Sequence, residues 1–239
     1  MVWTVAVGGA RLPCQSVVPP PMRPSAALAC LALLVSGLPV VGCVPYAVGT
    51  TPAVVAPQDV EPSVTLQAVS SRRDLDDDDD GPKGAGLTIA NAARLGLDGR
   101  SDIGVQLTGI GGLTATYKRR LSGAGDQGAS VIVGGGIVGT SHLHVEATLV
   151  ASPGPLAVAP LVTPYGGVRV QDLTPFSDGL ASGPAVGLFV GGRFGWPDLA
   201  VSPELGLFYS PSPLAGDNDV VVVPSVTIRG ERIRRALGI

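Results

Sequence analysis

The chain has 239 residues, and its 19 acidic and 16 basic residues give a formal net charge of −3. This charge balance argues against nucleic acid as a partner. With 45% hydrophobic residues, 34 glycines and 22 prolines, the composition excludes a disordered chain and argues against a mainly helical one.

Residues 1–21 precede a segment that has the parts of an export signal. They end in three consecutive prolines, and Met22 follows. We therefore expect a start codon assigned too early, with a disordered leader as the alternative. Residues 22–42 supply Arg23 as the positive end and an apolar run, 26–38, that is too short to span a bilayer comfortably.

The end of this signal predicts lipid attachment. Residues 40–43, VVGC, resemble the lipobox of bacterial lipoproteins, in which the cysteine after the cleavage point carries lipid. The resemblance implies that Cys43 is acylated. It also implies the outer membrane, because Val44 stands where inner-membrane lipoproteins carry aspartate. The alternatives are a plain signal ending near Ala47 and an uncleaved anchor helix, which Pro39 would interrupt.

Cleavage before Cys43 would remove Arg11 and Arg23 and so change the formal net charge from −3 to −5. Cys14 and Cys30 would be lost as well. One acylated cysteine can form neither a disulfide framework nor a thiolate metal site.

The mature chain begins with an apolar, proline-rich stretch. Residues 43–59 predict an extended tether between the lipid and the folded part. From 60 to 230, apolar and polar residues alternate with a period of two, which is the pattern of half-exposed strands. The strands are predicted at 60–72, 83–97, 101–109, 112–121, 129–140, 142–152, 155–171, 184–195, 198–209 and 218–229.

Such a meander favours an all-β fold, an antiparallel up-and-down β-barrel of eight to ten strands over 60–230, followed by a basic tail, 231–239. Two closures fit the alternation. A soluble barrel has its apolar face inside, whereas a membrane barrel turns it toward lipid. The side chains that distinguish the closures, because they point inward only in the soluble one, are Ile103, Val105, Leu107, Leu143 and Val145.

The low content of charged residues favours the membrane barrel. A solvated exterior usually carries about a quarter charged residues or more, and this chain has 15%. A membrane barrel whose narrow lumen holds paired arginine and glutamate fits this low content of charged residues better than a soluble barrel does. Aromatic residues make up only 4%, but Phe194, Trp196, Phe208 and Tyr209 are predicted to form part of an aromatic girdle.

One stretch carries a family resemblance. Residues 94–121, RLGLDGRSDIGVQLTGIGGLTATYKRRL, resemble the hairpins of small outer-membrane β-barrels, with their Gly-Leu, turn and Asp-Ile-Gly pattern. The resemblance implies a barrel in the outer membrane. Such barrels usually end in a strand with a terminal aromatic residue, whereas this chain continues past Arg229 and ends at Ile239.

Five consecutive carboxylates, 76–80, need solvent or a cation. Asp76, Asp78 and Asp80 offer oxygen ligands to calcium at alternate positions, but no glutamate closes an EF-hand loop. A solvated extracellular loop is the preferred interpretation.

The two histidines, His142 and His144, lie on the polar side of one strand with Glu146. Lipid-modifying outer-membrane barrels use histidine, serine and acidic residues in comparable positions, but Ser141 points to the other face. We favour a structural network in the lumen, in which Glu146 pairs with Arg169 or Arg193. The predicted network comprises Arg94, His144, Glu146, Arg169, Arg193 and Glu204.

The sequence thus predicts an outer-membrane lipoprotein β-barrel with a structural or narrow transport role, and neither catalysis nor a cofactor. The predicted partner is the lipid bilayer, and no oligomeric state is predicted. One alternative is a soluble periplasmic or surface barrel that binds a small apolar ligand. The other is an outer-membrane lipid-modifying hydrolase.

Overall fold

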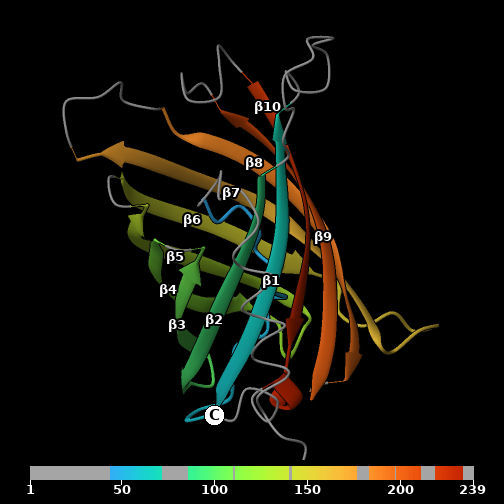
Figure 1. Cartoon of the computed structure of the whole chain (residues 1–239). Coiled ribbons are helices and arrows are strands. Elements are labelled where there is room, and N and C mark those ends of the chain that lie inside the picture. Colours follow the sequence, from blue (N-terminus) through green and yellow to red (C-terminus); the bar gives the residue numbers. More distant parts are fainter. Residues whose placement is uncertain are drawn as a thin grey trace, which may run out of the picture. The chain divides into compact units, whose positions relative to one another are not determined.

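Ten antiparallel strands close into a barrel in the order β1-β10-β9-β8-β7-β6-β5-β4-β3-β2 (Figure 1). The computed structural model describes residues 44–71, 86–109, 111–139, 142–176, 183–196, 198–210 and 219–233. The strands are β1 (Val60–Ser71), β2 (Gly86–Asp98), β3 (Ser101–Thr108), β4 (Gly112–Ser122), β5 (Gly128–Val138), β6 (His142–Ser152), β7 (Val162–Pro175), β8 (Ala185–Trp196), β9 (Leu199–Ser210) and β10 (Asp219–Arg229).

The prediction of an up-and-down barrel is confirmed, and every strand except β7 begins and ends within three residues of its predicted bounds. For β7 the predicted start, 155, is too early. Pro155 and Pro160 have no N–H to give to a strand ladder. The intervening residues form a turn instead, in which the Leu156 N–H donates to the Val162 carbonyl at 2.9 Å.

An even number of strands brings both ends of the meander to one end of the barrel. β1 begins there and β10 ends there, and the short β2–β3 and β8–β9 connections lie there too. We call this the turn end and the opposite one the loop end. Beyond β10, residues 231–233 form one helical turn, and no helix in the described part of the chain is long and apolar enough to cross a membrane.

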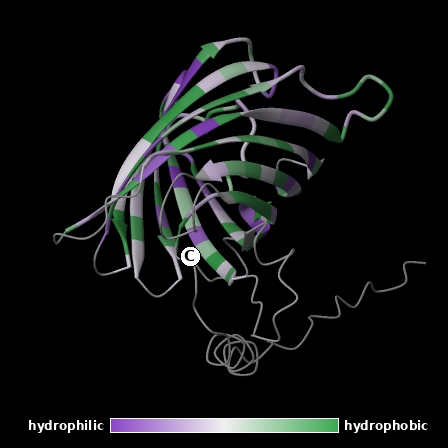
Figure 2. Cartoon of the chain, turned by 90° about the horizontal axis from the view of Figure 1, so that it is seen from above, coloured by the Kyte–Doolittle hydropathy of each residue, from purple (hydrophilic) through white to green (hydrophobic). Residues whose placement is uncertain are grey.

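Hydrophobic and hydrophilic residues alternate along the strands (Figure 2). The apolar side chains are the exposed ones, and most of the buried side chains are polar, so the wall is apolar outside and mostly polar inside. The five side chains that distinguish the closures all point outward, with 41–54% of their surface exposed. The soluble barrel, which needs these side chains in its core, is therefore not the closure that the structure has. Inward positions carry, among others, Gln67, Thr88, Asp102, Lys118, His144, Arg169, Ser202, Glu204, Thr227 and Arg229.

Outward aromatic side chains lie near both ends of the barrel. Phe194 and Trp196 are exposed near the turn end, and Tyr209 is exposed near the loop end. Phe208 is only 1% exposed and points into the lumen. Its predicted place in the girdle is therefore wrong, because adjacent residues of a strand face opposite sides.

Candidate functional site in the barrel lumen

Residues 44–58, which we call the plug, run through the lumen (Figure 1, blue). They belong to the segment expected to be an extended tether, and they form neither helix nor strand. The plug begins level with Gln67, toward the loop end, where the Val44 carbonyl accepts a bond from the Gln67 amide at 2.6 Å. It leaves at the turn end, where the Gln58 N–H donates to the Gly96 carbonyl.

Two wall residues hold the loop-end half of the plug through its backbone N–H groups. The Gln67 Oε1 accepts from the Ala47 N–H at 3.0 Å. The two carboxylate oxygens of Glu204 accept from the N–H groups of Val48 and Gly49, at 2.8 and 2.9 Å. A carboxylate with two such donors is satisfied without an arginine.

Lys118 holds the middle of the plug. Its ammonium group, 1% exposed, donates to the Thr50 hydroxyl at 3.0 Å, to the Thr51 carbonyl at 2.6 Å and to the Ala53 carbonyl. Three donors thus meet three acceptors, which is the full capacity of a lysine. A buried charge is tolerated only when it is satisfied in this way.

Further wall groups continue this pattern toward the turn end. The Ser130 hydroxyl donates to the Pro52 carbonyl at 2.6 Å. One carboxylate oxygen of Asp102 accepts from the Val55 N–H at 3.0 Å. The bonds from the wall therefore reach mainly the main chain of the plug.

Gly49 is a point of close approach between plug and wall. Its φ is +56°, and a Cβ built on it would lie 2.1 Å from the Thr227 hydroxyl oxygen. The Arg229 guanidinium also donates to the Gly49 carbonyl. Both the backbone conformation and the space require glycine here.

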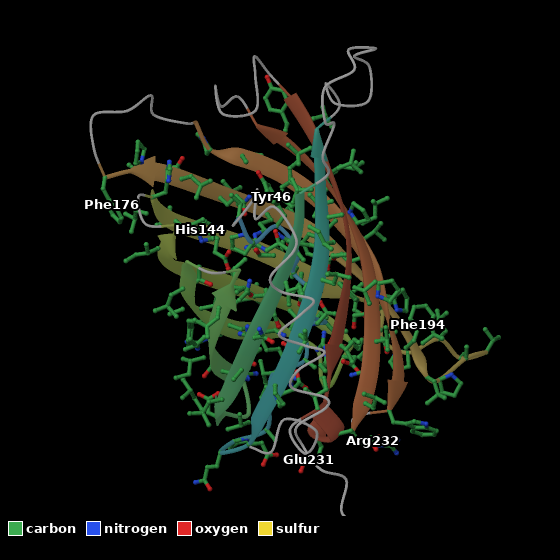
Figure 3. All side chains as sticks on the ribbon, viewed as in Figure 1. Tyr46, His144, Phe176, Phe194, Glu231 and Arg232 are labelled. Carbon is green, nitrogen blue, oxygen red and sulfur yellow. The ribbon has the colours of Figure 1, made fainter. Side chains whose placement is uncertain are left out.

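Two plug side chains occupy apolar parts of the lumen. Tyr46 is labelled in Figure 3. Its ring meets that of Phe208 edge to face at 4.8 Å, beside Val221 and Val223. Val48 packs against a second cluster. Tyr46 and Val48 thus add apolar packing in the part of the lumen where neighbouring plug residues form hydrogen bonds. The second cluster consists of Ile132, Val150, Tyr165 and Phe189.

Three residues of the predicted network meet on the β6–β7 wall. The Arg169 guanidinium donates to the Glu146 carboxylate, and the two side chains are 4% and 6% exposed. Arg169 also donates to the carbonyls of Tyr46 and Ala47, at 3.1 Å each. The His144 Nε2 lies 3.7 Å from the Glu146 Oε2. Arg169, one of the two expected partners of Glu146, thus joins the wall to the plug.

The other members of the predicted network lie elsewhere in the lumen. Arg193 pairs at 2.5 Å with Asp126, whose carboxylate also accepts from the Thr51 hydroxyl. Arg94 pairs at 2.5 Å with Asp102. Glu204 bonds the plug, as described above. These six residues therefore form several sites along one plug rather than one continuous network.

The predicted network includes Arg169 and Glu204, which bond the plug, but it leaves out three other wall residues that do so. Gln67, Asp102 and Lys118 all occupy inward positions of the alternation, so their direction was readable. Asp102 and Lys118 also stand opposite each other on β3 and β4. Their binding partner could not be predicted, because the plug sequence has no regular alternation of apolar and polar residues.

The lumen around the plug leaves little free space. A cavity of about 60 Å³ lies between the plug and the wall residues Arg94, Glu146 and Arg169. It has room for a few water molecules, at about 15 Å³ each.

The other predicted sites receive no geometric support here. Cys43 and the calcium candidates Asp76, Asp78 and Asp80 lie outside the described residues. Within the described ranges, no three His, Cys, Asp or Glu side chains are grouped so that they could hold a metal ion. His144, the histidine of the hydrolase alternative, is enclosed in the wall and has no hydrogen-bonded nucleophile.

The fold and lumen define a closed ten-stranded antiparallel barrel with an apolar exterior and a lumen filled by its own chain. No protein-family model matches the sequence, and no curated protein matches it.

Among solved structures, Neisserial surface protein A is 13% identical, with 72% of this chain and 95% of that chain covered and a TM-score of 0.33. A de novo designed transmembrane β-barrel is 11% identical, with 73% and 98% covered and a TM-score of 0.30. The attachment invasion locus protein Ail of Yersinia pestis is 14% identical, with 71% and 96% covered and a TM-score of 0.27. Likenesses this distant carry no inference about function.

Proposed function

We propose that this protein is an integral outer-membrane β-barrel with a structural role, whose lumen is closed by its own plug. The observation that carries the proposal is the polarity of the wall. Each of the ten strands presents large apolar side chains outward, while charged groups such as Lys118, Arg169 and Glu204 are enclosed.

An apolar surface this extensive is stable only against lipid or another apolar partner. Soluble monomers rarely expose contiguous apolar patches of more than a few hundred Å², whereas here the exposed apolar side chains encircle the barrel. Strands of 8 to 14 residues match the roughly 9–11 residues with which a tilted strand crosses a bilayer. Aromatic side chains near both ends suit the two membrane interfaces.

The plug favours a structural role over transport. With the plug in place, the cavity between the plug and the wall residues Arg94, Glu146 and Arg169 has a volume of about 60 Å³, enough for a few waters. We therefore expect no steady ion conductance from the intact protein in a planar bilayer. Steady conductance would contradict the structural role and favour narrow transport.

Membrane insertion can be tested with one charge placed at two depths. Leu205 points outward in the middle of β9, and Leu121 points outward near the end of β4. In phospholipid vesicles, Leu205→Arg should lower the free energy of unfolding by about 2–4 kcal/mol, and Leu121→Arg by only about 0–1 kcal/mol. Urea titration followed by Trp196 fluorescence measures both. Equal losses, or a wild-type monomer that stays soluble without detergent, would contradict the proposal.

Lipid attachment at Cys43 is a separate part of the proposal. Its support is the sequence of residues 40–43, VVGC, which resembles a lipobox. Intact-mass measurement of the mature N-terminus distinguishes an acylated Cys43 from the alternative cleavage near Ala47.

A further inference from the structure

The barrel holds the plug through atoms that every peptide has. Gln67, Glu204 and Asp102 accept from its N–H groups, whereas Lys118 and Arg169 donate to its carbonyls. Bonds to the main chain do not depend on the side chains that it carries. The wall therefore recognises an extended backbone, as peptide-binding proteins that bond the main chain do.

The plug is also separable from the sheet. All ten strands pair with their neighbours into a closed ring without it. The plug adds only one isolated bridge, between Pro57 and Gly96 at the turn end. The barrel thus satisfies its own strand backbone, and the plug is held by inward side chains alone along 44–55.

We propose that the lumen is a binding site for an extended polypeptide with mostly small side chains, and that the plug is its exchangeable occupant. The narrow lumen selects small residues, and the contact with Thr227 selects a glycine at position 49. Without an occupant, Lys118 and Glu204 lose the hydrogen bonds that they form with the plug. The vacated lumen therefore binds a second peptide of the same kind, whether from this chain or from another protein.

The test uses the full chain, folded in detergent, with a specific protease recognition sequence inserted between Gln58 and Asp59. Both residues are exposed, so the folded protein can be cut there. A fluorescent peptide with the sequence of residues 44–58 is then added in excess. We expect saturable uptake of the peptide, measured by fluorescence anisotropy, into the cut protein and not into the uncut one.

Two altered peptides test how the site recognises its occupant. A Gly49→Val peptide should bind at least about tenfold more weakly, equivalent to about 1.4 kcal/mol, because its Cβ meets Thr227. A Val54→Ala peptide keeps every main-chain group and should bind within about threefold. Equal binding of the Gly49→Val and native peptides would overturn the proposal.

Two barrel variants complete the experiment. Lys118→Met removes the donor to the Thr51 and Ala53 carbonyls, so peptide uptake should weaken. Arg232→Ala breaks an exposed pair outside the lumen and should leave uptake unchanged. Failure of the cut plug to exchange, or loss of the folded band in cold SDS on cutting, would show that the plug is an integral part of the barrel. Because binding is read in detergent, the result is independent of the proposed membrane location.

Discussion

The pair of Glu146 and Arg169 allows a quantitative test of the lumen. Replacing Glu146 by glutamine keeps the shape of the side chain but removes its charge. Arg169 then loses its carboxylate while remaining buried. Removing one partner of a buried ion pair costs about 3–5 kcal/mol.

The structure places the expected loss near the lower limit of that range. Arg169 keeps two other acceptors, the carbonyls of Tyr46 and Ala47 at 3.1 Å, and glutamine still offers an amide oxygen. We therefore expect Glu146→Gln to lower the free energy of unfolding by about 3 kcal/mol. Arg169→Met should cost at least as much, because it also frees the two plug carbonyls.

The assay is a double-mutant cycle by urea unfolding in detergent micelles. The double variant should be less destabilised than the sum of the single variants by about 2 kcal/mol, since the pair is lost only once. The exposed pair of Arg232 and Asp198 serves as control, with an expected coupling of about 0–1 kcal/mol. Strictly additive losses at Glu146 and Arg169 would refute the reasoning that they form one buried pair.

Two further predictions concern the plug and its start. Gly49→Val in the full chain should lower stability by about 1–3 kcal/mol from backbone strain alone, whereas Gly99→Ala, which meets no atom within 4 Å, should change it by less than about 0.5 kcal/mol. A loss at Gly49 no larger than that at Gly99 would contradict the close approach to Thr227. Cys43→Ser should abolish incorporation of a palmitate analogue, because serine cannot accept a thioether-linked lipid. Equal labelling of variant and wild type would exclude the lipobox assignment.

The strands could be predicted from the sequence because apolar and polar residues alternate along the whole length of each wall strand. In β6, the alternation from His142 to Ser152 sets both the bounds and the face of each side chain. The same alternation suits a soluble and a membrane barrel equally. The alternation alone therefore does not show whether the apolar or the polar face lines the lumen. In β10 even the polar face is hard to recognise, because it carries Val221 and Val223.

The plug was not readable for a different reason. Its residues are mostly small and follow no period, and the wall bonds mainly to its main chain, which is the same in any sequence. A sign of the missing occupant does exist in the wall. Glu204 points inward without a charged partner directly opposite, since Ser225 and Gly191 lie beside it on the neighbouring strands. Inward charges without a partner on the neighbouring strand indicate a ligand, or a piece of chain, in the lumen.

The contacts of the plug also impose an order of events on folding. Gly49 meets Arg229, 180 residues further along the chain, and Val48 meets Glu204, 156 residues away. These partners take their places only when β9 and β10 have paired, so contacts of such long range form late. The plug is joined to β1 at the turn end and reaches toward the loop end. The first described residues to be synthesised are therefore among the last to find their partners, and an open barrel precedes the sealed one.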